Sequence, residues 1–326
     1  MKRRQLITKA LQLGAGASLW IPAHSQAPAR IWPTDNVKLI VPFPAGGGTD
    51  RLARLIALRM GEQTGHSFVV ENKPGAGGNI AAAQVARSGD PHALLFTTTA
   101  IAVSPFIYAK LGYSLAKDLQ PIIHVSSSPL VLVVKDSSPI TNIDGVAKAA
   151  ASKLGGLNYG SPGVGTTSHL GGFMLTKKLK MSASHVAYRG AGQTINALIA
   201  GEIDFSLMAA VSVLPFVRNK LLRAVAVAGK RPLADLTEIP LMGNAPYNLD
   251  FDNWQGVLIS SAVAKPSADA INAAFNEVIR LQDVRTAVYT DGATPVGGTG
   301  LEFKNRVTLD GNKYGGIVIS AGIKPE

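Results

Sequence analysis

Val41-Pro42-Phe43-Pro44-Ala45-Gly46-Gly47-Gly48-Thr49-Asp50 joins an apolar run, residues 37–41, to an amphipathic segment. The apolar run predicts a buried strand. In the segment that follows, apolar residues recur from 52 to 60 at helical spacing and arginines occupy the other faces, which predicts a helix. Thr49 or Asp50 is the expected N-cap, because short polar side chains accept hydrogen bonds from the first free amides of a helix.

The three glycines of this loop suit an anion-binding site. Gly46, Gly47 and Gly48 carry no side chain that blocks a ligand, and their backbone can aim successive N–H groups into one concavity. The start of a helix adds unpaired N–H groups and a partial positive charge. A carboxylate fits such a cup. The alternative is that the glycines only form a tight connection between the strand and the helix.

Length and composition favour a globular protein with two lobes of α/β type, since the chain has 326 residues, 46% of them hydrophobic and 16% charged. The absence of cysteine excludes disulfides, thiolate chemistry and cysteine-ligated metals. The six histidines are dispersed without metal-ligand spacing. We therefore expect no metal and no cofactor.

Residues 1–25 are predicted to be an export signal peptide. Basic residues up to Lys9 precede a mildly apolar stretch, and Ala23-His24-Ser25 offers a small-x-small cleavage site. The apolar stretch, about 12 residues long, is too short to span a membrane. Arg3-Arg4 resembles a twin-arginine signal, and the general secretory route stays open. The predicted location is the periplasm.

The charge of the chain favours a small anionic ligand over nucleic acid. Residues 1–25 hold four basic and no acidic residues, so their removal lowers the formal charge from +11 to +7. The remaining lysines and arginines are scattered and form no polybasic run, which argues against nucleic-acid binding. A basic field attracts small anions weakly and in a salt-dependent way.

Further along the chain, strand and helix patterns alternate. The sequence predicts strands at 67–70, 93–96, 122–125, 130–134, 157–159, 185–188, 203–207, 223–227 and 251–259, and helices at 80–87, 143–153, 166–179, 195–200, 267–282 and 301–314. Thr299 and Glu302 have the spacing of a capping box. A break at 126–129 and the return at 251 define lobe 1 as 26–127 plus 251–326 and lobe 2 as 128–250. Each lobe is predicted to be a mostly parallel sheet flanked by helices, with the ligand cleft between the lobes.

Five motifs, in this order and spacing, resemble those of the tripartite tricarboxylate transporter substrate-binding proteins, the Bug or TctC-like family. They are residues 42–50, the Val70-Glu71-Asn72-Lys73-Pro74-Gly75-Ala76-Gly77-Gly78 segment, residues 160–170, Ala187-Tyr188-Arg189-Gly190, and Gly201-Glu202-Ile203-Asp204. The likeness extends over essentially the whole chain after residue 25. It implies a type II Venus-flytrap binding protein that captures a small carboxylate and presents it to membrane permease subunits.

The resemblance also implies ligand-binding residues. In lobe 1 these are Phe43, Ala45, Gly46 and Gly47, with Gly75 and Gly77 nearby. In lobe 2 they are Ser161 and Thr166, and Asp204 is expected at the cleft. Thr98 and Ser128 are further candidates because each follows a predicted strand. The ligand class stays open among dicarboxylates, tricarboxylates, amino acids and aromatic acids.

Enzymatic readings of the same residues are weaker. Gly160-Ser161 is no nucleophile elbow, because Tyr159 stands where that motif needs glycine. His169 is expected to have a structural role at a helix start. Arg189 remains open between a carboxylate clamp and a structural brace. We expect a monomeric, non-catalytic binding protein. The alternatives are a periplasmic sensor for a two-component system and, less favoured, a hydrolase or isomerase on the same lobes.

Overall fold

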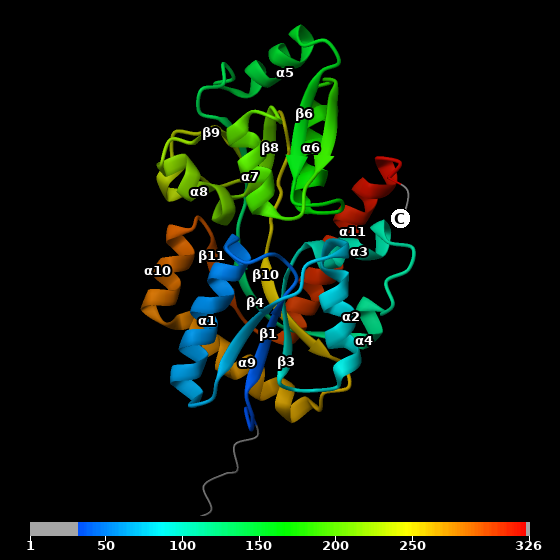
Figure 1. Cartoon of the computed structure of the whole chain (residues 1–326), viewed down its shortest axis with the longest axis vertical. Helices are drawn as coiled ribbons and strands as arrows, with labels where there is room; N and C mark the ends of the chain where they lie inside the picture. Colours follow the sequence, from blue (N-terminus) through cyan, green and yellow to red (C-terminus); the bar gives the residue numbers. More distant parts are fainter. Residues whose placement is uncertain (1–31, 324–326) are drawn as a thin grey trace, which may run out of the picture. The chain divides into compact units, whose positions relative to one another are not determined.

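A computed structural model describes residues 32–323, so the expected export signal lies outside the described residues. Two sheets organise the described chain (Figure 1). The first has the order β11-β4-β10-β3-β1-β2, and the second β7-β6-β8-β5-β9. The strands of the first are β1 (Val37–Val41), β2 (Phe68–Asn72), β3 (Ala93–Thr98), β4 (Leu119–Ser127), β10 (Gln255–Ser260) and β11 (Thr294–Gly297). Those of the second are β5 (Leu130–Lys135), β6 (Leu157–Ser161), β7 (Ala183–Ala187), β8 (Phe205–Ala209) and β9 (Leu222–Ala228).

The α/β fold of two sheets flanked by helices is confirmed, but both sheets are mixed rather than mostly parallel. In the first sheet, β1 pairs in parallel with β2 and β3, whereas β10 runs antiparallel between β3 and β4. In the second, β5 runs antiparallel between β8 and β9. β11, at the edge of the first sheet, also runs antiparallel to its neighbour β4. β10 and β5 are the strands that the chain enters as it crosses from the other sheet. The crossing sets the direction of these two strands, and the local sequence does not indicate it.

Helices cover both faces of each sheet. Apolar residues of α1 (Gly48–Thr64), α9 (Lys265–Arg280) and α10 (Gln282–Thr290) pack on one face of the first sheet, and those of α2 (Asn79–Ser88) and α3 (Ala100–Ile107) pack on the other. The second sheet lies between α5 (Ile143–Ser152) with α6 (Thr167–Lys178) and α7 (Ala191–Ala200) with α8 (Ala210–Arg218). The remaining elements are α4 (Leu115–Asp118), α11 (Gly300–Ser320) and the short turns η1 (Ala76–Gly78) and η2 (Ala234–Leu236).

The last helix belongs to both cores. Phe303 and Val307, near the start of α11, pack in the first sheet's core, whereas Tyr314 and Val318 pack in the core of the second. Figure 1 shows this helix continuing past the first sheet toward α6. The predicted capping box is confirmed, since Thr299 accepts from the Glu302 amide and Glu302 accepts from that of Thr299. No helix within residues 32–323 is long and apolar enough to cross a membrane.

Short elements were the hardest to predict. The sequence pattern did not reveal α3, α4, α8, α10 or β11, because each has at most 9 residues, too few to show a clear hydrophobic period. The expected N-cap of α1 is also wrong. The helix begins at Gly48 with Gly47 as its N-cap and has no side-chain cap. Asp50 lies inside the first turn, and its carboxylate reaches back to the loop.

Candidate functional site

A cavity of about 400 Å³ lies where loops from the two sheets meet. The loops follow the carboxyl ends of β1, β3, β6, β7 and β8, and β10 contributes the residues before its amino end. This is the edge at which open α/β sheets bind ligands. The lining residues are Phe43 to Asp50, Thr98, Pro162, Thr166 to Ser168, Arg189, Ala191 to Gln193, Asn196, Met208, Ala209, Ser212 and Asn253.

The wall formed by the first sheet, residues 43–50 with Thr98 and Asn253, presents backbone amides. Within residues 32–323, the amides of Gly47, Gly48 and Thr49 have no hydrogen-bond partner. They form the first turn of α1, which carries a partial positive charge. A Cβ added at Gly46 would meet no atom within 4 Å, so this part of the loop faces open space. The geometry is that of a site for an anionic oxygen.

One of the expected amides is already occupied. The Asp50 carboxylate accepts from the Gly46 amide at 2.9 Å, from Asn72 Nδ2 at 2.8 Å and from Arg54 Nε at 3.0 Å. Burial alone would raise the pKa of Asp50, but the bonds from Arg54, Gly46 and Asn72 together lower it. Asn72 also donates to the Phe43 carbonyl at 3.0 Å, which fixes the loop at both ends. Gly46 lines the cavity, but its N–H belongs to this internal network.

The wall formed by the second sheet, residues 162–168, 189–196 and 208–212, presents side chains. Thr166 is the N-cap of α6, and its hydroxyl donates to the Gly163 carbonyl at 2.8 Å. Gly190 is the N-cap of α7, which has no side-chain cap. The exposed Arg189 donates its own amide to Gln193 Oε1, and its guanidinium has no partner among the described residues. This wall therefore carries an unpaired cation and a second open helix start.

Two stacked imidazoles support the second wall from behind. The rings of His169 and His185 lie 3.9 Å apart between centroids. His169 Nδ1 accepts from the Gly165 amide at 3.2 Å, and His185 Nε2 lies 2.7 Å from Ser161 Oγ. Burial lowers the pKa of His169 to about 4; burial and the neighbouring His169 lower the pKa of His185 to about 3. Both rings are neutral near pH 7 and hold the loop in place.

Six of the eleven predicted binding residues line the cavity: Phe43, Ala45, Gly46, Gly47, Thr98 and Thr166. Gly75 and Gly77 do not. Their loop folds into η1, in which the Gly78 amide donates to the Gly75 carbonyl at 2.8 Å. A Cβ at Gly77 would lie 2.6 Å from Tyr108 Oη. The second glycine loop thus lies outside the cavity lining.

Ser128, Ser161 and Asp204 are also absent from the cavity wall. Ser128 is buried in the crossing between the sheets, where its Oγ accepts from the Val211 amide. Ser161 is fully buried and donates to the Gly163 carbonyl or the adjacent imidazole. Asp204 precedes β8 and therefore lies at the opposite end of that strand from the cavity. There it pairs with Lys153 at 2.7 Å and accepts from the Asn158 amide. The expectation that Asp204 lies at the cleft is wrong.

Several lining residues escaped sequence analysis. Thr167 Oγ1 donates to Asn253 Oδ1 at 3.2 Å, which connects the second wall to the strand entering β10. Ser212 and Asn196 also line the cavity. The available signal was weak: polar residues just outside an apolar strand, or in the first turns of a helix. Placing Asn253 requires knowing that β10 runs antiparallel, because its amino end then shares the edge with the carboxyl ends of the others.

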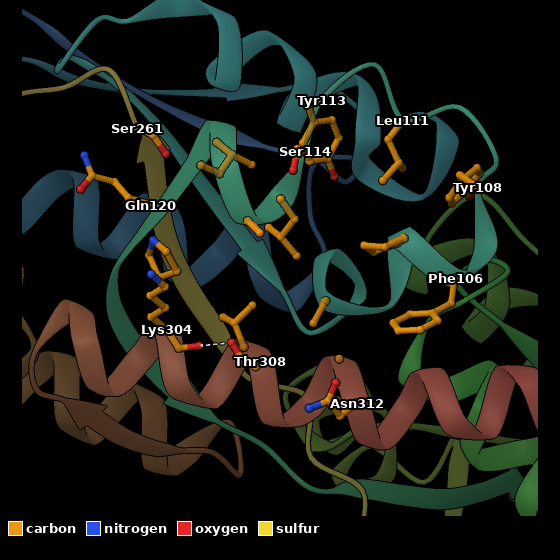
Figure 2. Close-up of a pocket in the computed structure, with 18 of the residues that line it drawn as sticks. Phe106, Tyr108, Leu111, Tyr113, Ser114, Gln120, Ser261, Lys304, Thr308 and Asn312 are labelled. Carbon is orange, nitrogen blue, oxygen red and sulfur yellow. Dashed lines mark hydrogen bonds between the residues drawn. The ribbon is translucent and has the colours of Figure 1, made fainter.

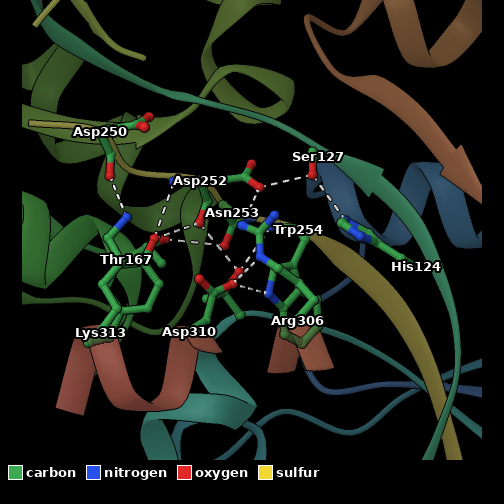
Figure 3. Close-up of polar contacts among 12 residues, drawn as sticks. His124, Ser127, Thr167, Asp250, Asp252, Asn253, Trp254, Arg306, Asp310 and Lys313 are labelled. Atoms are coloured by element: carbon green, nitrogen blue, oxygen red, sulfur yellow. Dashed lines mark hydrogen bonds and ion pairs between the residues drawn. The ribbon is translucent and has the colours of Figure 1, made fainter. Parts of the chain in front are cut away.

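Next to the cavity, a charged network ties together the two crossings between the sheets (Figure 3). Asp252, before β10, accepts from Ser127 at the end of β4 and from Arg306 on α11, at 2.9 and 2.7 Å. Arg306 also donates to Asp310, which accepts from Trp254 Nε1. Burial raises the pKa of Asp252 although Arg306 opposes this. The network joins both crossings to the helix that belongs to both cores.

A larger groove of about 690 Å³ lies elsewhere, between α3, the 108–116 segment, the start of β4 and α11 (Figure 2). Its lining is mainly apolar, with Phe106, Leu111 and Tyr113 among the labelled side chains and Lys304 near one end. The helix that starts beside it, α4, has only 4 residues, whereas the smaller cavity lies at the starts of the longer helices α1 and α7. Polar groups that converge on a concave site are what fixes a small ligand, so the smaller cavity is the candidate site.

The cavity lining provides binding groups, and the Ser161–His185 pair lies behind it. Ser161 and His185 are within hydrogen-bond distance, as a nucleophile and its base would be. However, Ser161 is fully buried behind the wall, and no carboxylate among the described residues orients the imidazole. What the cavity offers is free peptide N–H groups on one side and a guanidinium on the other. Both recognise oxyanions.

Comparison with known proteins gives a consistent picture. Residues 52–321 match the family described as tripartite tricarboxylate transporter family receptor. A UPF0065 protein of Cupriavidus necator is 32% identical over 290 residues, covering 88% of each chain. The periplasmic binding protein BugD superposes with a TM-score of 0.85 at 25% identity, over 90% of this chain and 100% of its own. An R. palustris protein solved with adipate has a TM-score of 0.86 and 28% identity, over 90% of this chain and 100% of its own. MatC from Rhodopseudomonas palustris with bound malate has a TM-score of 0.82 and 26% identity, over 88% of this chain and 100% of its own.

Proposed function

Because the chain belongs to the family of tripartite tricarboxylate transporter receptors, we propose that it captures a small carboxylate in the cavity between its two sheets and delivers it to a membrane permease. The observation that carries this proposal is the set of free amides at Gly47, Gly48 and Thr49, which line the cavity at the start of α1. One ligand carboxylate binds there. The function implies export to the periplasm.

The second wall selects among acids. Arg189 is the one cation lining the cavity on this wall, and its guanidinium is unpaired within residues 32–323. A second carboxylate of the ligand can accept its parallel N–H donors. Adipate and malate, found in two similar proteins, both have two carboxylates. We therefore favour a dicarboxylate over a monocarboxylate. A cavity of about 400 Å³ suits a molecule of that size.

A thermal-shift panel followed by calorimetry tests this function. The mature protein is heated with acetate, benzoate, malate, adipate, citrate and glutamate, and each acid that raises the unfolding midpoint is titrated. A ligand that binds only the folded state stabilises it in proportion to RT ln(1 + [L]/Kd). We expect malate or adipate to raise the midpoint most. Mass spectrometry of the recovered acid must show no turnover.

Stabilisation by none of these acids would refute the proposal, as would chemical consumption of the acid that stabilises the protein. A ligand-bound crystal structure provides a geometric test. Electron density for the acid at the Gly47, Gly48 and Thr49 amides is the expected result. Density in the groove beside α4 would instead place the site away from those amides.

A further inference from the structure

Asp50 presents an electrostatic problem for an anion-binding site. Its carboxylate is 4% exposed and lines the same cavity as the free amides of the first wall. An uncompensated negative charge there would repel the acid that the site is proposed to bind. The residue nevertheless stabilises the loop, because it accepts the Gly46 amide and the Asn72 amide nitrogen. The site therefore needs a group that neutralises Asp50 without filling the cavity.

Arg54 meets this requirement. Its Nε donates to Asp50 at 3.0 Å and its second nitrogen donates to Asn72 Oδ1 at 3.0 Å, so one guanidinium holds both residues that fix the loop. It sits one turn further along α1 and does not line the cavity. Its side chain is 52% exposed, so the pair adds little to folding stability. Its contribution to the site is the positive charge that it places beside a buried carboxylate.

We propose that Arg54 is a positioning residue of the ligand site: by pairing with Asp50, it lets the first wall accept an anionic ligand. This inference rests on the proposed function. Other charged groups are already engaged or lie on the opposite wall. Arg51, on the same helix, pairs with Asp291 and donates to the Val211 carbonyl, and Lys73 pairs with Glu71 on the neighbouring segment. Arg189 lines the opposite wall.

The test compares Arg54→Met with the double variant Asp50→Asn/Arg54→Met. The probe is malate or adipate, whichever stabilises the wild-type protein more, titrated by calorimetry at pH values from 8 to 5. Asp50 keeps two donors in Arg54→Met, so the loop should remain folded, and circular dichroism checks this. At pH 8 the affinity of Arg54→Met should fall on the order of tenfold. The double variant removes the charge but keeps an oxygen acceptor for the Gly46 amide, so it should recover most of the loss.

The pH profile separates electrostatics from loop structure. Without Arg54, the buried carboxyl of Asp50 binds a proton more readily as the pH falls. The ratio of wild-type to Arg54→Met affinity should therefore shrink toward pH 5, and titration of the acid itself cancels in that ratio. The ratio of wild-type affinity to double-variant affinity should stay constant over the same pH range. Arg54→Lys, which keeps the charge, should lose less affinity than Arg54→Met.

Three results would overturn the inference. The first is an Arg54→Met affinity equal to that of the wild type at every pH. The second is equal, pH-independent weakening of the single and double variants, which would mean that Arg54 only supports the loop. The third is a wild-type protein that binds none of the tested acids, and this result alone would also remove the proposed function. Binding by the wild type with no effect of Arg54 would leave the function standing.

Discussion

The two walls of the cavity do different work with different chemistry. The first-sheet wall exposes peptide N–H groups, and Arg54, outside the wall, neutralises the charge of its Asp50 carboxylate. The second-sheet wall exposes a free guanidinium at Arg189 and rests on two neutral imidazoles. Backbone amides recognise any carboxylate, whereas a single charged side chain selects ligands by the position of a second carboxylate. We infer that the first wall holds the group common to all ligands and the second wall distinguishes them.

Acid should produce the largest difference between the walls. In the folded state the pKa values of His169 and His185 lie below the unfolded value of about 6.5, so both rings bind protons less readily than in the unfolded chain. Stability is therefore full above that pKa and is lost as the pH falls toward 4, by about 1.4 kcal/mol per pH unit for each histidine. Because the pKa of Asp50 is lowered, the folding stability that its carboxylate contributes is lost only at pH values below about 4. Urea unfolding of the ligand-free protein at pH 7, 6 and 5 measures this.

The control for this prediction is the double variant His169→Phe/His185→Phe. It removes the two titrating rings of the second wall but keeps His124, whose pKa burial also lowers to about 4. The free energy of unfolding of this variant should depend less steeply on pH than that of the wild type. Identical pH dependence of the two proteins would show that the imidazole pair does not support the wall.

Gly47→Val should abolish binding at the first wall. Gly47 has a φ of −73°, and an added Cβ would meet its nearest heavy atom, Pro44 O, at 3.9 Å. Valine therefore fits the backbone and projects from the cavity wall. Affinity for every carboxylate should fall by more than about 100-fold, or about 3 kcal/mol, by calorimetry. The same change at Gly46 is less informative, because its φ of +86° would strain a valine.

Gly316→Val is the matched control for stability. Gly316 is exposed on α11, has open space around its Cβ position and is remote from the cavity lining. Both valine variants should unfold within about 2 °C of the wild type. Retention of wild-type affinity by Gly47→Val would contradict the assignment of the first wall.

Arg189→Gln should weaken dicarboxylates selectively. The glutamine keeps a hydrogen-bond donor but removes the charge that we assign to the second carboxylate. Affinity for malate or adipate should fall about tenfold, or about 1.4 kcal/mol, while any binding of acetate stays unchanged. The measurement is a pair of calorimetric titrations on each protein. Equal losses for mono- and dicarboxylates would assign Arg189 a structural role.

Gly192→Val should have the smallest effect. Gly192 lines the cavity from the second wall, and no atom lies within 4 Å of its Cβ position. It is the counterpart of Gly47 on the other wall. The added methyl groups should change the preference among acids by about threefold, with the larger acids losing most. A general loss as large as that of Gly47→Val would mean that the two walls are equivalent.

The two glycine loops of the first sheet show how far local sequence can be trusted. Both follow a strand and precede a helix, and both were expected at the ligand. In residues 75–78 the glycines are needed because neighbouring groups crowd them: a Cβ would lie 2.5 Å from Ile80 Cδ1 at Gly75 and 2.9 Å from Pro42 Cβ at Gly78. In the first loop the same space is open at Gly46, whereas a Cβ at Gly48 would meet Val211. Glycine thus stands at these positions for two different physical reasons, and only the neighbouring groups reveal which reason applies.

The sequence by itself determined the longer elements and the family. The run at Val37–Val41, the helix after the glycines, the capping box at Thr299 and the five family motifs are local patterns, and local hydrogen bonding and hydrophobic period suffice to specify them. The tertiary structure alone decided the antiparallel β10, the place of Asp204 away from the cavity, and the pairing of Arg54 with the carboxylate that occupies the Gly46 amide. These depend on which distant groups meet, because a buried polar atom takes its partner from whatever the fold brings within 3 Å of it.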